Sequence, residues 1–294
     1  MSNINAKTKV FGVIGNPIGH TLSPFIHNTV AKEINRDLVY TAFKVTEAGL
    51  ENAIKGAFEL GIAGLNVTVP HKKAIMPYLY SLDTTAAAVG AVNTIKLTEK
   101  GYIGYNTDMV GVYYALKDKN IQIENKTVLI LGAGGAANAC VAMAASKGAK
   151  KIYVANRTIE NAQMLCDHVS QYYKTEYISL SLSDISTLRD CNIVINATTL
   201  GFSDKAQLTP ITDLSFYTNN QIEVVLDAIY SPWETLLLKQ AQEQGVKNVI
   251  NGFPMLVYQA IAAQEIWYDK ELTPEFKNYI YQLLLNKYKE NIYE

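Results

Sequence analysis

One segment limits the possible folds of this chain more than any other: an apolar strand that runs into a glycine-rich turn and an alanine-rich helix. The strand covers 127–131, and Gly-Ala-Gly-Gly-Ala-Ala follows it directly. This run fits the spacing G-x-G-x-x-G/A, whose first glycine allows a tight turn and whose second lets the backbone approach a pyrophosphate. The free N–H groups at the start of the helix favour phosphate. A purely structural turn is the alternative. The segment predicts a dinucleotide-binding Rossmann unit, with these cofactor-binding residues: Gly132, Ala133, Gly134, Gly135 and Ala136.

The end of the next strand indicates which dinucleotide fits. The strand Lys151–Ala155 is followed by Asn156, Arg157 and Thr158, and no acidic residue comes before Glu160. NAD-binding folds usually place an acidic residue here for the ribose 2′-hydroxyl. An arginine with a hydroxyl would instead pair with a 2′-phosphate. NADP is therefore favoured over NAD, with Arg157 as a solvated loop residue being the alternative.

A second set of polar residues lies earlier in the chain. Lys72 and Lys73 follow a buried strand that ends at a proline, and Asp108 comes later. The reduction of a ketone needs a proton for the oxygen, which a lysine can supply. The residue pattern leaves open which of the two lysines acts.

Hydroxyl and amide groups accompany this lysine. Thr21 and Ser23 stand at the start of a helix, where hydroxyls and free N–H groups can hold a carboxylate. An ordinary helix N-cap is the alternative for Ser23. Asn66, Thr68 and Asn93 either surround an oxygenated ligand or only tie loops together. Together with the dinucleotide turn, these groups suggest hydride transfer between a nicotinamide and an oxygenated small molecule.

Strands and helices alternate along the chain, which indicates an α/β fold of mostly parallel sheets covered by helices. Helices are expected from Ser23 as cap, over 47–60, and over 136–147, 255–268 and 274–288. The expected strands are Val10–Ile14, Leu38–Val45, Gly64–Val69, Asn93–Leu97, Thr127–Leu131, Lys151–Ala155, Tyr177–Leu180, Asn192–Asn196, Glu223–Ala228 and Asn248–Ile250. Two domains follow: a mixed or mostly parallel substrate-binding domain over 1–108 and 251–294, and a Rossmann domain over 109–250. The C-terminal helices return to the first domain.

Composition narrows the class of protein. The 294 residues are 49% hydrophobic, with a net charge of −1, so nothing favours nucleic acid or an anionic membrane. No apolar run reaches the length of a membrane span, and the polar start lacks the core of a signal peptide, so we expect a cytoplasmic protein. Cys140, Cys166 and Cys191 lack paired spacing and are expected to be buried. His20 and His27 flank a helix start and are not expected to bind metal together.

These segments together resemble the shikimate dehydrogenase family over nearly the whole chain. The resemblance rests on an ordered series of motifs rather than on one of them. The motifs are Gly15–Pro24 with His27 and Asn28, Asn66–Lys72, Ala91–Thr94, Asn106–Asp108, Gly132–Ala137, Asn156–Thr158, Asn196–Thr198 with Gly201, Asp227–Tyr230 with Pro232, and Met255–Val257 with Gln259.

The resemblance implies an activity and a role for each residue. The family reduces 3-dehydroshikimate to shikimate with NADPH, the fourth step toward chorismate. By resemblance, Lys72 is the acid/base and Asp108 its partner, which also binds substrate hydroxyls. Thr21 and Ser23 would hold the carboxylate. The ring would be surrounded by Asn66, Thr68, Asn93, Tyr230 and Gln259, and the nicotinamide would lie near Ala228 and Gly252. A homodimer is left open.

The chain departs from the family pattern at four positions. Thr21 stands where serine is usual, so quinate remains a candidate substrate. Met109 and Pro254 replace common glycines. Asn161 stands where NADP-specific members often carry a second arginine, and losing that contact would cost on the order of 1.5–3 kcal/mol of discrimination. The alternatives are therefore a quinate/shikimate dehydrogenase that uses NAD, and a non-catalytic sensor of a dinucleotide or a shikimate-like acid.

Overall fold

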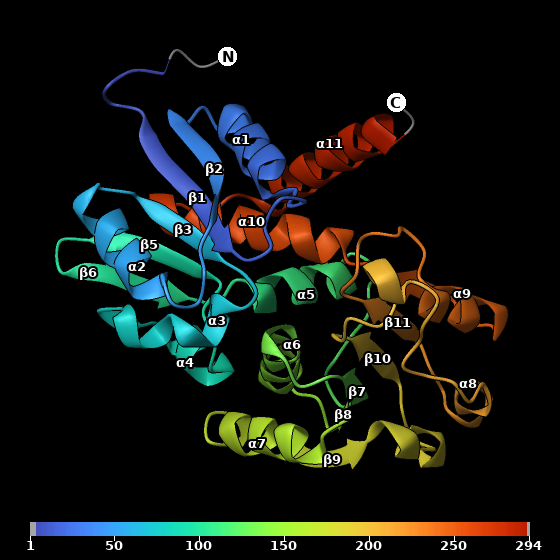
Figure 1. Cartoon of the computed structure of the whole chain (residues 1–294). Coiled ribbons are helices and arrows are strands. Elements are labelled where there is room, and N and C mark those ends of the chain that lie inside the picture. Colours follow the sequence, from blue (N-terminus) through green and yellow to red (C-terminus); the bar gives the residue numbers. More distant parts are fainter. Residues whose placement is uncertain (1–3, 293–294) are drawn as a thin grey trace. The chain divides into compact units, whose positions relative to one another are not determined.

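The computed structural model describes residues 4–292, which divide into two compact units (Figure 1). The first unit contains the residues up to Ala87, Ala91–Thr107, and those from Val257 onward. The second contains Ala88–Gly90 and Asp108–Leu256. Each unit is built around its own six-stranded sheet.

The first unit contains a mixed sheet in the order β2-β1-β3-β5-β6-β4. Its strands β1, β2 and β3 are parallel, whereas β5 is antiparallel to both β3 and β6. The strands are β1 (Lys9–Gly15), β2 (Leu38–Lys44), β3 (Gly64–Val67), β4 (Ser81–Leu82), β5 (Thr94–Thr98) and β6 (Gly101–Tyr105). The carboxyl ends of β1 and β3 and the amino end of β5 therefore meet at one edge.

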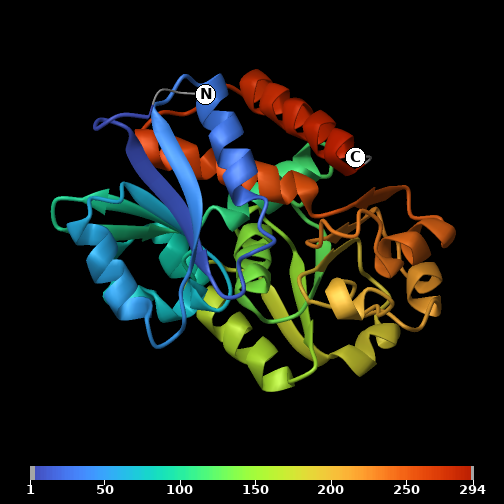
Figure 2. The same cartoon turned by 45° about the horizontal axis from the view of Figure 1, so that its top comes forward.

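Helices cover both faces of this sheet because side chains alternate along each strand. On one face, Phe11 and Val13 of β1 form a core with Trp267, where α1 and α11 also lie side by side (Figure 2). On the other face, Ile14 packs in a core with Ile54 of α2. The helices are α1 (Ser23–Glu33), α2 (Leu50–Glu59), α3 (His71–Ala74) and α11 (Pro274–Ile292), with the 3₁₀ turn η1 (Met76–Tyr78). Most of α4 (Thr84–Val89) and of α10 (Phe253–Tyr268) also belongs to this unit, whereas Ala88, Val89 and Phe253–Leu256 are assigned to the second.

The second unit contains an all-parallel sheet in the order β12-β11-β10-β7-β8-β9. This is the order of a doubly wound Rossmann fold, whose switch point lies between β7 and β10, so ligands are expected beyond the carboxyl ends of those strands. The strands are β7 (Thr127–Leu131), β8 (Lys151–Asn156), β9 (Glu176–Ser181), β10 (Ile193–Asn196), β11 (Val224–Asp227) and β12 (Asn248–Ile250).

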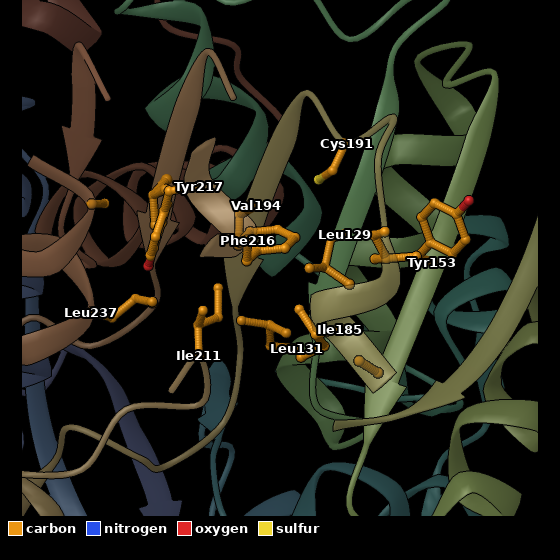
Figure 3. Close-up of a cluster of buried hydrophobic side chains, with 14 of the residues drawn as sticks. Leu129, Leu131, Tyr153, Ile185, Cys191, Val194, Ile211, Phe216, Tyr217 and Leu237 are labelled. Carbon is orange, nitrogen blue, oxygen red and sulfur yellow. The ribbon is translucent and has the colours of Figure 1, made fainter. Parts of the chain in front are cut away.

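Both faces of the second sheet are buried. One face packs Leu129, Leu131 and Val194 against Phe216 and Leu237 (Figure 3). The other is covered by α5, α6 and α7. The helices are α5 (Asp108–Lys117), α6 (Gly135–Ser146), α7 (Ile159–Ser170), α8 (Ser215–Asn219) and α9 (Leu236–Glu243), with 3₁₀ turns η2 (Leu182–Thr187) and η3 (Ser203–Lys205).

The predicted fold class is confirmed, with a few local differences. The strand expected over 64–69 ends at Val67 because the next residues form a turn in which the His71 N–H donates to the Thr68 carbonyl over 2.8 Å. Sequence analysis did not identify β4 and β6. The C-terminal helices contribute to the first unit, as expected, and the three cysteines are free and buried.

Candidate functional site

Polar side chains gather at the carboxyl edge of the first sheet, within the first unit. Asn66 stands near the end of β3, and its cross-strand partner is Thr94 at the start of β5. Thr94 also pairs with Tyr105 at the end of β6, so Asn106 and Thr107 follow at the same edge. The antiparallel insertion of β5 thus brings residues distant in sequence to one place.

The Asn66 carboxamide is the centre of a buried hydrogen-bond network. Its Nδ2 donates to the Asn93 carbonyl oxygen over 3.2 Å and to Thr94 Oγ1 over 2.9 Å. Its Oδ1 accepts from the Tyr40 hydroxyl over 2.7 Å. The side chain is only 6% exposed, so these bonds compensate for the loss of water.

The network continues through Asn93 and Thr107. Asn93 Oδ1 accepts from the Thr107 N–H over 2.8 Å, and Asn93 Nδ2 donates to Thr107 Oγ1 over 2.9 Å. Thr107 Oγ1 in turn lies 3.5 Å from Gln259 Oε1. Predicted substrate residues from β3, the β5 start and α10 therefore belong to one network.

Thr21 and Ser23 lie at the start of α1, also in the first unit. Thr21 Oγ1 donates to Ser23 Oγ over 3.1 Å and accepts from the Ser23 N–H over 3.2 Å. The expected N-cap role of Ser23 is wrong: Leu22 is the cap residue, and no side chain caps the helix. The Ser23 hydroxyl is therefore not used for capping.

Lys72 lies in α3, a single helical turn directly after the end of β3. The neighbouring His71 is fully buried, and its Nε2 lies 2.8 Å from the Val45 carbonyl oxygen, which fixes the turn to the end of β2. The Lys72 carbonyl accepts from the Val92 N–H over 2.8 Å. Lys72 is half-buried whereas Lys73 is exposed, so the two lysines differ in their exposure. Thr68, half-buried, precedes this turn.

Two of the residues predicted for catalysis or substrate binding belong to the second unit. Asp108 is the first residue of α5 and is buried, with 5% of its surface exposed. Tyr230 is half-buried in the loop after β11. The network around Asn66 belongs to the first unit.

The predicted pyrophosphate site is the turn after β7. Gly132 has φ of +105°, and a Cβ there would lie 3.2 Å from the backbone of Ala197. Gly134 is exposed and is the N-cap of α6, and a Cβ there would meet nothing within 4 Å. The start of this twelve-residue helix is therefore open to a ligand.

The adenosine end of the predicted site lies after β8. Arg157 and Thr158 are exposed, and the Arg157 guanidinium forms no hydrogen bond or ion pair with another residue within 4–292. Asn156 Nδ2 donates to the Thr158 carbonyl over 2.8 Å, which holds the turn before α7. Asn161 is exposed in the first turn of that helix. These residues can surround a 2′-phosphate.

A buried carboxylate holds the loops at the other side of the switch point. Asp227, at the end of β11, accepts from Asn196 Nδ2 over 3.0 Å, from the Ile229 N–H over 3.1 Å and from the Thr235 hydroxyl over 2.7 Å. Its burial raises its pKa to about 6, although these three donors oppose the rise. Asp227 thereby fixes the loop that carries Ala228 and Tyr230.

Gly252 is needed where this loop meets the residues after β12. Its N–H donates to the Ile229 carbonyl over 2.8 Å, and a Cβ there would lie 2.1 Å from the Ala228 carbonyl oxygen. No other residue fits without displacing the backbone. Gly252 and Ala228, both predicted to lie near a nicotinamide, are therefore neighbours.

Sequence reasoning missed Tyr40, Thr94 and Thr107 as members of the network.

No metal site was expected from the sequence. Within 4–292, no group of three or more histidine, cysteine or acidic residues is arranged to hold a metal ion. The same described residues include no helix that is both long and apolar enough to span a membrane.

Comparison with known families gives two consecutive matches. The profile of the shikimate dehydrogenase substrate binding domain matches residues 13–95. The profile of shikimate / quinate 5-dehydrogenase matches residues 115–201. Apart from Ala88–Gly90, the first match lies in the first unit, and the second match lies within the second unit.

Individual relatives cover nearly the whole chain. The shikimate dehydrogenase (NADP(+)) of Nitrosopumilus maritimus is 42% identical, over 90% of this chain and 94% of that relative. The enzyme of the same name from Methanocaldococcus jannaschii is also 42% identical, over 90% and 93%. A crystal structure of shikimate 5-dehydrogenase from Listeria monocytogenes in complex with shikimate and NAD has a TM-score of 0.87 at 33% identity, covering 97% and 99%.

Proposed function

The chain belongs to the shikimate dehydrogenase family, and from this we propose that it catalyses the reversible NADPH-dependent reduction of 3-dehydroshikimate to shikimate. The relatives over 90% of the chain carry this activity and this cofactor in their names. In this proposal the reaction is a step on the route to chorismate and the aromatic amino acids. It takes place in the cytoplasm.

One observation carries the proposal: the network around Asn66 joins residues from separate segments at one edge of the first sheet. Asn66, Asn93 and Gln259 are connected through Thr107 and Thr94. A polyol ring presents several hydroxyls, each of which needs a hydrogen-bond partner when it is removed from water. A fixed set of amides and hydroxyls satisfies that need, while Thr21 and Ser23 bind the carboxylate at the start of α1.

Lys72 is the proposed general acid in the direction of reduction. It gives its Nζ proton to the carbonyl oxygen as the carbon accepts hydride, and it takes the proton back in the oxidation. The short turn of α3 limits the reach of this side chain, because His71 ties the turn to the end of β2. Asp108 is its proposed partner and a ligand for substrate hydroxyls. A double-variant cycle of Lys72→Ala and Asp108→Asn tests this pairing, since residues that act together give non-additive losses.

The residues of the second unit fit NADP. When bound, the nicotinamide supplies the hydride. Gly132, Gly134 and the start of α6 form an open turn that accommodates a pyrophosphate. Arg157 and Thr158 provide a charge and a hydroxyl for the 2′-phosphate. Ala228 and Gly252 line the proposed nicotinamide position, where Asp227 fixes the loop.

A second candidate is a dehydrogenase that also uses NAD and quinate. The exposed Asn161 in the first turn of α7 supports this candidate, since it supplies no positive charge for a 2′-phosphate. The relative from Listeria monocytogenes was crystallised with NAD. Thr21 adds a methyl group beside the proposed carboxylate position, which bears on the choice between shikimate and quinate.

One assay separates the candidates. Oxidation is followed at 340 nm with shikimate or quinate crossed with NADP or NAD. We expect kcat/KM to be greatest for shikimate with NADP. Comparable values with quinate or NAD would favour the broader enzyme. Thermal stabilisation by a ligand without turnover in any pairing would instead support a sensor. Light scattering of the same sample distinguishes a monomer from a homodimer.

A further inference from the structure

Tyr40, in β2, is held both through its backbone and through its ring. Its backbone N–H donates to Asn28 Oδ1 over 3.0 Å, and its carbonyl accepts from Asn28 Nδ2 over 2.9 Å. Its ring stacks on the buried His27 ring with centroids 4.2 Å apart and planes 6° apart. His27 in turn has its Nδ1 3.1 Å from Gln264 Nε2. Segments of α1 and α10 thus fix both the backbone and the ring of Tyr40.

The Tyr40 hydroxyl reaches the network around Asn66 at the edge of the first sheet. It donates to Asn66 Oδ1 over 2.7 Å. Burial raises the pKa of Tyr40 well above 10, and the Ser23 hydroxyl opposes part of that rise. The phenol therefore remains protonated at any assay pH and remains a donor. The Tyr40 hydroxyl thus bonds to Asn66, a proposed ring contact, and lies near Ser23, a proposed carboxylate contact.

The donors and acceptors around Asn66 allow only one orientation of its carboxamide. The Asn93 carbonyl can only accept, so the group 3.2 Å from it must be Nδ2. Thr94 Oγ1 gives its proton to Asn93 Oδ1, so toward Asn66 it also accepts. Both hydrogens of Nδ2 are therefore used inside the protein.

One hydrogen-bonding position of this carboxamide is left. Oδ1 has two lone pairs, and the Tyr40 hydroxyl occupies one of them. The second lone pair of Asn66 Oδ1 can only accept a hydrogen bond. A ligand atom that meets Asn66 must therefore bring a proton, as a hydroxyl does and a carbonyl does not.

We propose that Tyr40 is a positioning residue that sets the substrate specificity of this site: it holds Asn66 so that only an acceptor faces the ligand. The site then takes a ring hydroxyl at this position and rejects a carbonyl. This directs the carbonyl that is reduced to a different position on the ring. The inference rests on the proposed function, since Asn66 is a proposed substrate contact.

Removal of the Tyr40 hydroxyl tests the inference. In Tyr40→Phe the stacked ring remains but Oδ1 loses its fixed donor. We expect KM for shikimate to rise about tenfold, with KM for NADP and kcat nearly unchanged. Tyr102→Phe is the matched control, because the buried Tyr102 hydroxyl donates over 2.6 Å to the Ile62 carbonyl in the same unit and does not touch Asn66. A purely structural role predicts the same small change in both variants.

Shikimate analogues that each lack one ring hydroxyl give a second readout. With the wild-type enzyme, the analogue lacking the hydroxyl that meets Asn66 should lose most of its kcat/KM. In Tyr40→Phe, that loss should shrink for this analogue alone. Equal KM values for wild type and Tyr40→Phe, or equal losses for every analogue in both proteins, would overturn this inference but leave the proposed function intact. Failure of the wild-type protein both to oxidise shikimate and to bind it in calorimetry would overturn the proposed function, and this inference with it.

Discussion

The buried carboxyl of Asp227, which fixes the loop that carries Ala228 and Tyr230, should make the stability of the protein depend on pH. Burial raises the pKa of this carboxyl from 3.8 to about 6 in the folded protein. The folded state therefore binds more protons than the unfolded state between these values. The stabilisation is fully present below pH 3.8 and is lost as the pH rises through 6. An upward shift of this size corresponds to about 3 kcal/mol in total, of which about 1.4 kcal/mol separates pH 8 from pH 5.

The perturbation is Asp227→Asn, which keeps the shape of the side chain and removes its titration. The free energy of unfolding of wild type and variant is measured in urea between pH 8 and pH 5. We expect the difference, wild type minus variant, to rise by about 1.4 kcal/mol as the pH falls. Asp213→Asn is the control: Asp213 is exposed, and hydrogen bonds from the Ser215 side chain and from the Ser215 N–H, the latter 2.9 Å long, lower its pKa. Asp213 stays ionised in both the folded and the unfolded state between pH 8 and pH 5. The difference in free energy of unfolding between wild type and Asp213→Asn should therefore be constant. A constant difference for Asp227→Asn would show that burial does not raise the pKa of Asp227 in the folded protein.

Three further predictions concern other parts of the two units. Burial lowers the pKa of His27 from 6.5 to about 3, so its stabilisation is lost as the pH falls below 6.5. Wild type should lose about 2 kcal/mol of stability relative to His27→Phe between pH 7 and pH 5, measured by urea unfolding. Gly134→Ala should leave Tm unchanged, since the added Cβ meets nothing within 4 Å, but should raise KM for NADP about tenfold; an unchanged KM would argue against a pyrophosphate there. Arg157→Ala should lower kcat/KM with NADP by roughly 10- to 100-fold and leave NAD unaffected, so equal losses with both cofactors would exclude a 2′-phosphate contact.

The sequence predicted the regular parts of the fold well, for physical reasons that differ between elements. The strand β7 was predicted with its observed bounds because its apolar run is uninterrupted and ends at Gly132, where φ is +105°. The strand β4 was missed because two residues give no periodicity. The strand β6 was missed because glycines at 101 and 104 weaken its pattern.

The sequence predicts the conspicuous residues of the candidate site but not the hydrogen bonds that connect them. Lys72 follows an apolar strand and Asn66 is the polar residue within that strand, which makes both conspicuous in the sequence. Tyr40 lies inside a β-rich segment, where an aromatic side chain is an ordinary core residue. Its role depends on contacts with Asn28 and Asn66, which are distant along the chain. The contact of Thr94 with Asn66 depends on the antiparallel register of β5, which the sequence pattern leaves open.

The most direct test of the account compares kcat and KM of wild type, Lys72→Ala and Lys73→Ala with shikimate and NADP. Lys73, the exposed neighbour, is the matched control for charge and position. We predict that Lys72→Ala lowers kcat by about 10²- to 10⁴-fold with little change in KM, because proton transfer stabilises mainly the transition state. Lys73→Ala should match wild type. A large rise in KM at unchanged kcat for Lys72→Ala, or an equal loss in both variants, would contradict the assignment of Lys72 as the acid/base.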